Sequence, residues 1–91
     1  MHYLLSYDFV ENIGERRAPY REEHLKLVRE AHERGEIVMA GAAGERPDGA
    51  VLVFRTNDVQ DVEGFVKKDP YAANRLVTQW RVQPWTVVVS G

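Results

Sequence analysis

The sequence predicts a single α+β domain over residues 1–91, built on a four-stranded antiparallel sheet with two main helices. Three observations favour this fold class. The chain is short enough to form one small domain. Apolar residues alternate or run together in four segments and recur at helical spacing in two others. These segments follow one another in the order strand, helix, strand, strand, helix, strand.

A first strand is predicted over 2–9, because inward and outward positions alternate there. One side carries Tyr3, Leu5, Tyr7 and Phe9, and the other carries Leu4, Ser6 and Asp8. A helix is predicted over 19–34, because Pro19 suits a first turn and Gly35 follows as a stop. The inner stripe of this helix consists of Tyr20, His24, Leu27, Val28 and Ala31.

Two apolar strands are predicted over 36–42 and 49–56, joined by a turn-rich loop. A second helix is predicted over 57–68, and it starts with a capping pattern formed by Asn57 and Gln60. One face of this helix carries Val59, Val62 and Val66, with Phe65 beside them.

The last strand is predicted over 77–89. Its large side chains switch from even to odd positions at Pro84, which indicates a bulge or bend at a sheet edge. The stretch 11–19 is predicted to be a loop. The complete order of elements is the ferredoxin-like βαββαβ arrangement.

The two middle strands also predict a partner. Residues 37–40 and 50–54 are apolar on consecutive positions, a pattern typical of strands that are covered on both faces. Two helices cover only one face of a four-stranded sheet. An identical subunit is the simplest cover for the other face, so we expect a homodimer with the sheets packed face to face.

Composition narrows the class of protein further. A net charge of −2 gives no electrostatic reason to expect nucleic acid or an anionic membrane as a partner. The sequence lacks cysteine, which excludes disulfides and thiolate zinc sites and fits a cytoplasmic protein. The N-terminus does not resemble a signal peptide, and no apolar run approaches the ~18 residues of a membrane span.

His24 is the most informative candidate for chemistry. It lies on the core-facing stripe of the first helix, where an imidazole loses water and needs a hydrogen-bond partner. A backbone carbonyl as partner would make His24 structural, whereas a position at a pocket mouth would make it a general acid or base. Both roles remain open on the residue pattern alone. Structural roles are expected for His32 and His2.

Asp69 precedes Pro70, and this pair predicts the end of one helix and the start of a short one over 70–75. The Asp69 carboxylate is expected to cap that short helix through one oxygen. The other oxygen is then free to orient an imidazole N–H, as in base-plus-orienter pairs.

Arg21 lies three residues before His24 on a neighbouring part of the helix surface, and Arg17 precedes the helix. They either remain solvated or bind a carboxylate or a developing enolate. Ser6 and Asp8 share a strand face, and we expect them to line the same cavity. Neither a metal-binding histidine spacing nor a phosphate loop is present, so we expect no metal and no cofactor.

The order of motifs is familiar. An early strand ending in an acid precedes RxxHL at 21–25, a GAVLVF strand, DPY at 69–71 and a terminal W-x-V-x-PW strand. Over nearly its whole length the chain resembles the YciI-like (YCII-related) family of the dimeric α/β-barrel superfamily. The resemblance implies a ferredoxin-like fold, dimerisation through the sheet face and a site that pairs His24 with Asp69. The chain departs from the family pattern at Asn74 and Arg75, which predicts a different pocket shape.

We therefore expect a cofactor-independent enzyme that eliminates from, or isomerises, a small cyclic or aromatic compound, as in lyases and lactone isomerases of similar fold. His24 is expected to act as general base. Asp69 is expected to hold the imidazole tautomer and to stabilise the imidazolium.

The remaining site residues are expected to bind the substrate. Arg21, with Arg17, would neutralise an oxyanion, and Tyr71 and Tyr7 would shape the pocket. Two alternatives stay open: a non-catalytic dimeric module that binds a small ligand, and a structural domain in which His24 only joins its helix to Asp69.

Overall fold

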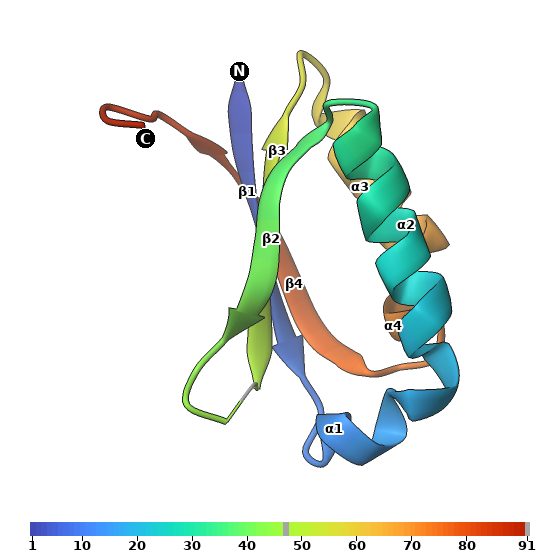
Figure 1. Cartoon of the computed structure of the whole chain (residues 1–91). Coiled ribbons are helices and arrows are strands. Elements are labelled where there is room, and N and C mark those ends of the chain that lie inside the picture. The colour runs from blue at the N-terminus through green and yellow to red at the C-terminus, as the bar shows by residue number, and fades with distance from the viewer. Residues whose placement is uncertain (47, 91) are drawn as a thin grey trace.

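A computed structural model describes residues 1–46 and 48–90. Strands and helices follow one another in the predicted order (Figure 1), the predicted short helix after Asp69 is present, and the structure adds two further short helices before the first long one. The elements in chain order are β1 (His2–Phe9), α1 (Ile13–Arg16), η1 (Ala18–Tyr20), α2 (Arg21–Glu33), β2 (Ile37–Ala43), β3 (Gly49–Arg55), α3 (Val59–Lys68), α4 (Pro70–Ala73) and β4 (Val77–Trp85).

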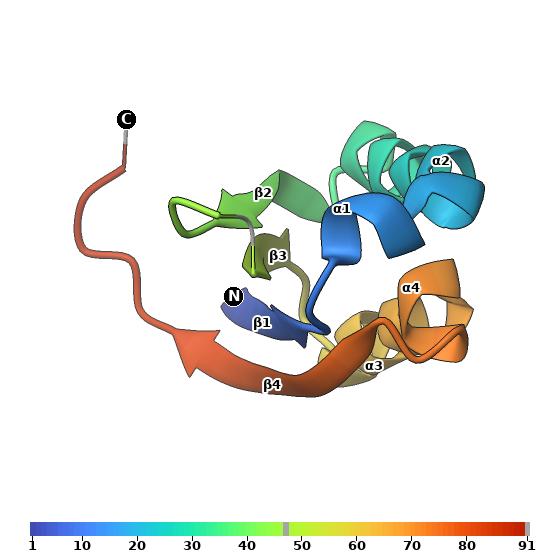
Figure 2. The same ribbon diagram turned by 90° about the horizontal axis from the view of Figure 1, so that it is seen from below.

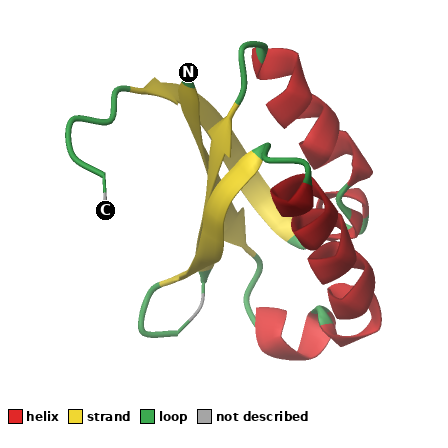
Figure 3. Ribbon diagram, turned by 45° about the horizontal axis from the view of Figure 1, so that its top comes forward, coloured by secondary structure: helices red, strands yellow, loops and turns green. Residues whose placement is uncertain are grey.

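The four strands form one antiparallel sheet in the order β2-β3-β1-β4. Both long helices, α2 and α3, lie on the same side of this sheet, so the molecule has two layers (Figures 1 and 3). Seen from below, the short helices α1 and α4 lie on that same side (Figure 2). The predicted fold class, a ferredoxin-like α+β domain, is confirmed.

The core lies between the sheet and the two long helices. In β1, Tyr3, Leu5 and Tyr7 all point toward the helices and are buried. Their partners across β3 are Phe54, Leu52 and Ala50. The helices contribute Ala31 from α2 and Val62, Phe65 and Val66 from α3. The predicted inner faces of both helices are therefore confirmed.

The opposite side of the sheet carries no helix in the described residues, and we call it the open face (Figure 3). The ladder places Met39, Val53 and Leu4 side by side on it. Met39 is 65% exposed, and Trp85 at the far edge is 43% exposed. Val53, between Met39 and Leu4, is only 6% exposed, so the strongly exposed apolar side chains of this face are Met39 and Trp85 near its edges.

Glycine is required at the start of β3. A Cβ atom at Gly49 would lie 2.7 Å from the backbone oxygen of Tyr7, which is fixed in the neighbouring strand. Gly49 therefore lets β3 approach β1 beside Tyr7, a residue that contacts the site described below.

Two predictions about the connections are wrong. Residues 11–19 are not a plain loop, because the chain turns at Asn12 with φ 62° and then forms α1 and η1 around the buried side chain of Ile13. The cap of α3 is Asp58 rather than Asn57, and its carboxylate accepts from the Gln60 backbone N–H at 2.9 Å.

The bulge predicted at Pro84 is also wrong, although β4 is an edge strand as expected. Pro84 pairs with Tyr3 and Trp85 with His2 without a shift of register. The irregularity lies at the other end of the ladder, between Asp8 and Phe9. The large side chain of Trp85 lies on the open face and does not indicate a bulge. The strand ends at Trp85 instead of continuing to residue 89.

None of the helices within 1–46 and 48–90 combines the length and the apolar character that crossing a membrane requires.

Candidate active site

Asp69 lies at the junction of α3 and α4. It adopts an extended conformation with ψ 119°, so α3 ends at Lys68 and Pro70 begins α4. This is the break that a residue before proline favours. The Asp69 side chain caps the new helix by accepting the Tyr71 backbone N–H at 3.0 Å. The carboxyl group is completely buried.

The buried carboxylate of Asp69 accepts two further hydrogen bonds. His24 Nδ1 lies 2.8 Å from Oδ1, and the Tyr7 hydroxyl donates to Oδ2 at 2.8 Å. The partners come from α2, β1 and the first turn of α4. Both oxygens are therefore satisfied by groups that other elements hold in place, which makes the position of this carboxylate rigid.

His24 is held from two directions. The carboxylate fixes one ring nitrogen, and the imidazole stacks on the Tyr71 ring with centroids 3.8 Å apart and planes 6° from parallel. Because a carboxylate accepts, Nδ1 carries a hydrogen and Nε2 carries the lone pair of the neutral ring. The His24 side chain is 13% exposed, and His24 lines a cavity.

The cavity has a volume of about 250 Å³. Its lining comes from the start of α2, from the middle strands and from α4. The residues are Phe9, Arg17, Arg21, His24, Leu25, Val28, Ala40, Gly41, Ala42, Ala50, Leu52 and Tyr71. An imidazole and two guanidinium groups therefore share a space whose other walls are aromatic rings, aliphatic side chains and small residues of the sheet.

Burial alters both tyrosines that contact Asp69. The pKa of Tyr7 is raised well above its ordinary value, first by burial, then by the charge of Asp69 and by the hydrogen bond between them. Burial also raises the pKa of Tyr71, whereas the nearby charges of Arg17 and Arg21 act in the opposite direction. Both phenols therefore stay protonated at neutral pH, and each can serve as a hydrogen-bond donor.

The structure brings together five of the predicted site residues: His24, Asp69, Tyr71, Arg17 and Arg21. The carboxylate of Asp69 is behind the imidazole rather than in the cavity wall.

Three other placements differ from the prediction. Ser6 and Asp8 do not line this cavity, because alternation along β1 turns them to the open face, where they border a separate hollow with Arg81. Tyr7 does not line it either. Its hydroxyl instead donates a hydrogen bond to Asp69 Oδ2.

Asn74 and Arg75 also lie outside the cavity lining. The Asn74 side chain donates to the Pro70 carbonyl at 2.8 Å and closes α4, while Arg75 takes the turn with φ 60°. Neither residue contacts the cavity directly, and their effect on its shape stays a prediction.

The sequence reasoning missed the sheet side of the cavity. Ala40 and Ala42 of β2 pair with Leu52 and Ala50 of β3, and all four side chains border the space beside His24. The signal was the run of small residues in AGAA, which leaves room above the sheet. Recognising it required the register of β2 on β3.

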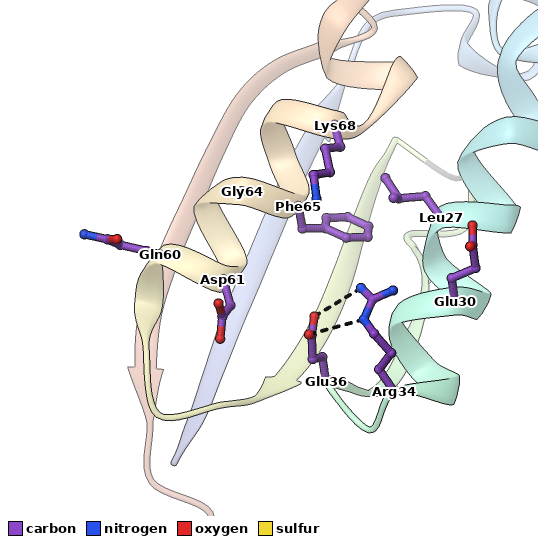
Figure 4. Close-up of a pocket in the computed structure, with 9 residues that line it drawn as sticks. All are labelled: Leu27, Glu30, Arg34, Glu36, Gln60, Asp61, Gly64, Phe65 and Lys68. Atoms are coloured by element: carbon purple, nitrogen blue, oxygen red, sulfur yellow. Dashed lines mark hydrogen bonds and ion pairs between the residues drawn. The ribbon is translucent and has the colours of Figure 1, made fainter.

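A larger hollow of about 430 Å³ lies between α2 and α3, near the opposite end of the helices (Figure 4). Arg34 and Glu36 form an ion pair across part of it, with both N–O distances 3.3 Å. Its charged groups are surface pairs that water screens, and no histidine borders it. We therefore place the candidate site at His24.

Metal ligation has no support at this position. Within 1–46 and 48–90, no group of three or more His, Asp or Glu side chains is arranged to hold a metal ion.

Comparison with known proteins agrees with this architecture. The profile of the YCII-related domain matches residues 1–86. The chain belongs to the YCII-related domain family. This match confirms the resemblance that RxxHL and DPY indicated. Among curated proteins, no sequence is similar enough to count as a match.

Solved structures share the fold. One is 5-chloro-2-hydroxyhydroquinone dehydrochlorinase (TftG) from Burkholderia phenoliruptrix AC1100, in complex with 2,5-dihydroxybenzoquinone, with TM-score 0.80, 20% identity and 94% of each chain covered. Another is an uncharacterized NIPSNAP-like domain protein from Burkholderia xenovorans, with TM-score 0.59, 14% identity, and 99% of this chain and 87% of that chain covered. At these identities the likeness shows the fold.

Proposed function

We propose that this YCII-related protein is a cofactor-independent enzyme that performs acid/base chemistry on a small cyclic or aromatic compound. One observation carries the proposal: the hydrogen bond from His24 Nδ1 to Asp69 leaves the lone pair of Nε2 beside a cavity. A base held in one orientation by a buried carboxylate is the arrangement that proton abstraction requires.

The chemistry begins at a carbon next to a carbonyl group. His24 Nε2 removes a proton from this carbon, and the electron pair of the C–H bond moves into the carbonyl to give an enolate. Asp69 stabilises the imidazolium that forms, and Arg21 and Arg17 offset the charge on the enolate oxygen. In an elimination, the electron pair then returns and expels a leaving group from the adjacent carbon. In an isomerisation, His24 gives the proton back at a different carbon.

The size and lining of the cavity support a ring as substrate. A volume of about 250 Å³ suits one small ring, and the flat stack of His24 on Tyr71 forms one wall. The fold likeness to TftG adds support, since that protein is a dehydrochlorinase of a hydroxyhydroquinone and holds a dihydroxybenzoquinone. A reaction of the same general kind, loss of a proton and a leaving group from an oxygenated ring, fits the residues of this chain.

The experiment is a substrate panel followed by NMR in D₂O. The panel contains chlorinated hydroxyhydroquinones, hydroxyquinones and small unsaturated lactones, and it reports both turnover and deuterium uptake at ring carbons. The His24→Ala variant is expected to lose about 10²–10⁴-fold in rate. His32→Ala is the matched control, because His32 lies on the same helix but bonds to the Ile37 carbonyl outside the cavity.

Two results would count against this proposal, one against the His24–Asp69 pair as the base and one against catalysis. Turnover that survives both His24→Ala and Asp69→Asn would exclude the pair as the base. A panel compound that binds with neither exchange nor turnover would instead indicate a non-catalytic ligand-binding module.

We also propose that the protein is a homodimer that pairs the open faces of two sheets. Support comes from the apolar row of Met39, Val53 and Leu4 on that face and from the exposure of Trp85. A second copy presents the same row and can cover it symmetrically. A monomer at micromolar concentration in light scattering would contradict this arrangement.

A further inference from the structure

The Tyr71 hydroxyl is an exception among the buried polar groups. Its oxygen is buried and lies beside the Arg21 guanidinium, which acts on it as a hydrogen-bond donor, but no group among the described residues accepts its hydrogen; the residue as a whole is 2% exposed. The ring is fixed by the stack on His24 and by an edge contact with Phe9, whose centroid lies 6.0 Å away. Buried hydroxyls nearly always have a partner, so a rigidly held one whose hydrogen lacks an acceptor indicates that something outside the chain supplies one.

The surroundings of this hydroxyl define the missing partner. Arg17 and Arg21 line the same cavity, and their charges act on the Tyr71 phenol. A guanidinium has donors and no acceptor, so neither arginine can take the phenolic hydrogen. The two guanidinium groups therefore share the cavity with a phenol whose hydrogen has no acceptor among the described residues. Their complement is an oxygen that only accepts, and the two positive charges favour a negative one.

We propose that Tyr71, Arg17 and Arg21 form a binding site for an ionised ring oxygen, so that the substrates are acidic hydroxylated rings bound as their anions. This inference rests on the proposed function, because it names the substrate class of the same cavity. The ring stack places Tyr71 directly against His24, with centroids 3.8 Å apart. One small ring can therefore present its ionised oxygen to Tyr71 and a neighbouring carbon to His24 Nε2.

The site also has a role in the reaction. When His24 takes a proton from a ring carbon, negative charge moves onto the ring oxygens. A neutral phenol O–H and two guanidinium groups that line the same cavity stabilise that charge. Tyr71 then contacts the substrate oxygen, while its backbone N–H continues to donate to Asp69.

The test is calorimetric titration with 2,5-dihydroxybenzoquinone, which ionises at its hydroxyl groups. Tyr71→Phe keeps the ring stack and the helix cap and removes only the hydroxyl. We expect this variant to bind the quinone about 10- to 100-fold more weakly than the wild type. Tyr3→Phe is the matched control and should bind normally, because the Tyr3 hydroxyl contacts Met1 away from the cavity.

Further binding measurements test whether the ligand must be negatively charged. The neutral 2,5-dimethylbenzoquinone should bind the wild type weakly and should be insensitive to Tyr71→Phe. Arg21→Gln should weaken binding of the dihydroxyquinone, whereas Arg16→Gln should not, since Arg16 does not line the cavity. Benzoate separates a ring oxygen from a carboxylate. If benzoate binds more tightly than the quinone with the same dependence on Tyr71, the ring-oxygen assignment is overturned.

Different experimental results would contradict the anion site and the catalytic role of His24. His24→Gln should keep its affinity for the dihydroxyquinone, since the anion site does not include the base. Quinone binding that depends on Tyr71 without any turnover would sink the catalytic proposal and leave the anion site standing. Equal quinone affinity of Tyr71→Phe and the wild type, or no quinone binding by the wild type, would overturn the inference.

Discussion

His24 and Asp69 lie 45 residues apart in the chain, and His24 Nδ1 lies 2.8 Å from Asp69 Oδ1. The same oxygen accepts the Tyr71 backbone N–H and so caps α4. One carboxylate therefore ends α3, begins α4 and orients an imidazole on α2. Because one buried carboxylate makes all of these contacts, the stability of the fold and the geometry of the candidate site depend on each other.

Asp69→Asn tests this dependence through stability. The substitution removes the buried negative charge and replaces one acceptor oxygen with an amide N–H₂, so the hydrogen bond at that position is lost or must reverse its direction. We expect a loss of about 1–3 kcal/mol in the free energy of unfolding, measured by urea denaturation. Glu63→Gln is the matched control on the exposed side of α3 and should stay within about 0.5 kcal/mol of the wild type. Equal effects of the two substitutions would contradict the role given to Asp69.

Tyr7 makes the protein sensitive to alkaline pH. Its pKa is raised in the folded state by burial and by Asp69, so above about pH 10 the unfolded chain releases a proton that the folded chain retains. The contribution of this group is complete below that pH and declines above it, by about 1.4 kcal/mol per pH unit.

Tyr7→Phe isolates this contribution. The variant loses the hydrogen bond to Asp69, and its free energy of unfolding should fall less steeply than that of the wild type between about pH 10 and 11.5. Urea denaturation at a series of pH values measures both slopes. Identical slopes for the two proteins would mean that Tyr7 ionises in the folded state as it does in water.

Two glycines should respond in opposite directions to alanine. At Gly49 the new Cβ would collide with the Tyr7 backbone oxygen at 2.7 Å, and the strands would have to separate. We expect Gly49→Ala to cost about 1–3 kcal/mol of stability. Gly64 lies inside α3 with open space around it, so Gly64→Ala should add up to about 1 kcal/mol. Thermal unfolding of both variants checks the pair, and a neutral Gly49→Ala would refute the close approach of β3 to β1.

The proposed dimer predicts a specific change of mass. Met39 lies in the apolar row of the open face, and a carboxylate there would be buried between two subunits. Met39→Asp should therefore be a folded monomer by sedimentation at concentrations where the wild type is a dimer. Glu33→Asp, on the opposite layer, should leave the mass unchanged. A wild type and a Met39→Asp variant of equal mass would reject the open face as the interface.

Residue spacing, proline positions and capping patterns were enough to predict the four strands, the two long helices and half of the site. Helical spacing placed His24 on the inner face of α2, and the proline after Asp69 fixed both the helix break and the cap. That the two residues meet followed from the family pattern rather than from local rules. The hydrogen bond from the Tyr7 hydroxyl to Asp69 depends on how β1 lies relative to α4 in three dimensions. Residue spacing along the chain does not give that arrangement.

The errors have physical causes. Ser6 and Asp8 were placed in the cavity although alternation along β1 sends them to the face opposite Tyr7. The capping pattern offered two adjacent polar residues, and the extended backbone at Asp58 decides between them. The small residues Ala40 and Ala42 acquire meaning only after β2 pairs with β3.

The central claim is that Asp69 holds the neutral imidazole of His24 with its hydrogen on Nδ1 and its lone pair on Nε2. Long-range ¹H–¹⁵N correlation spectra of the histidine rings measure this directly, without a substrate. We predict that His24 in the wild type is the Nδ1–H tautomer, and that Asp69→Ala, which leaves Nδ1 without its acceptor, removes this preference. A neutral His24 that carries its hydrogen on Nε2 in the wild type would contradict the account, because no base would then face the cavity.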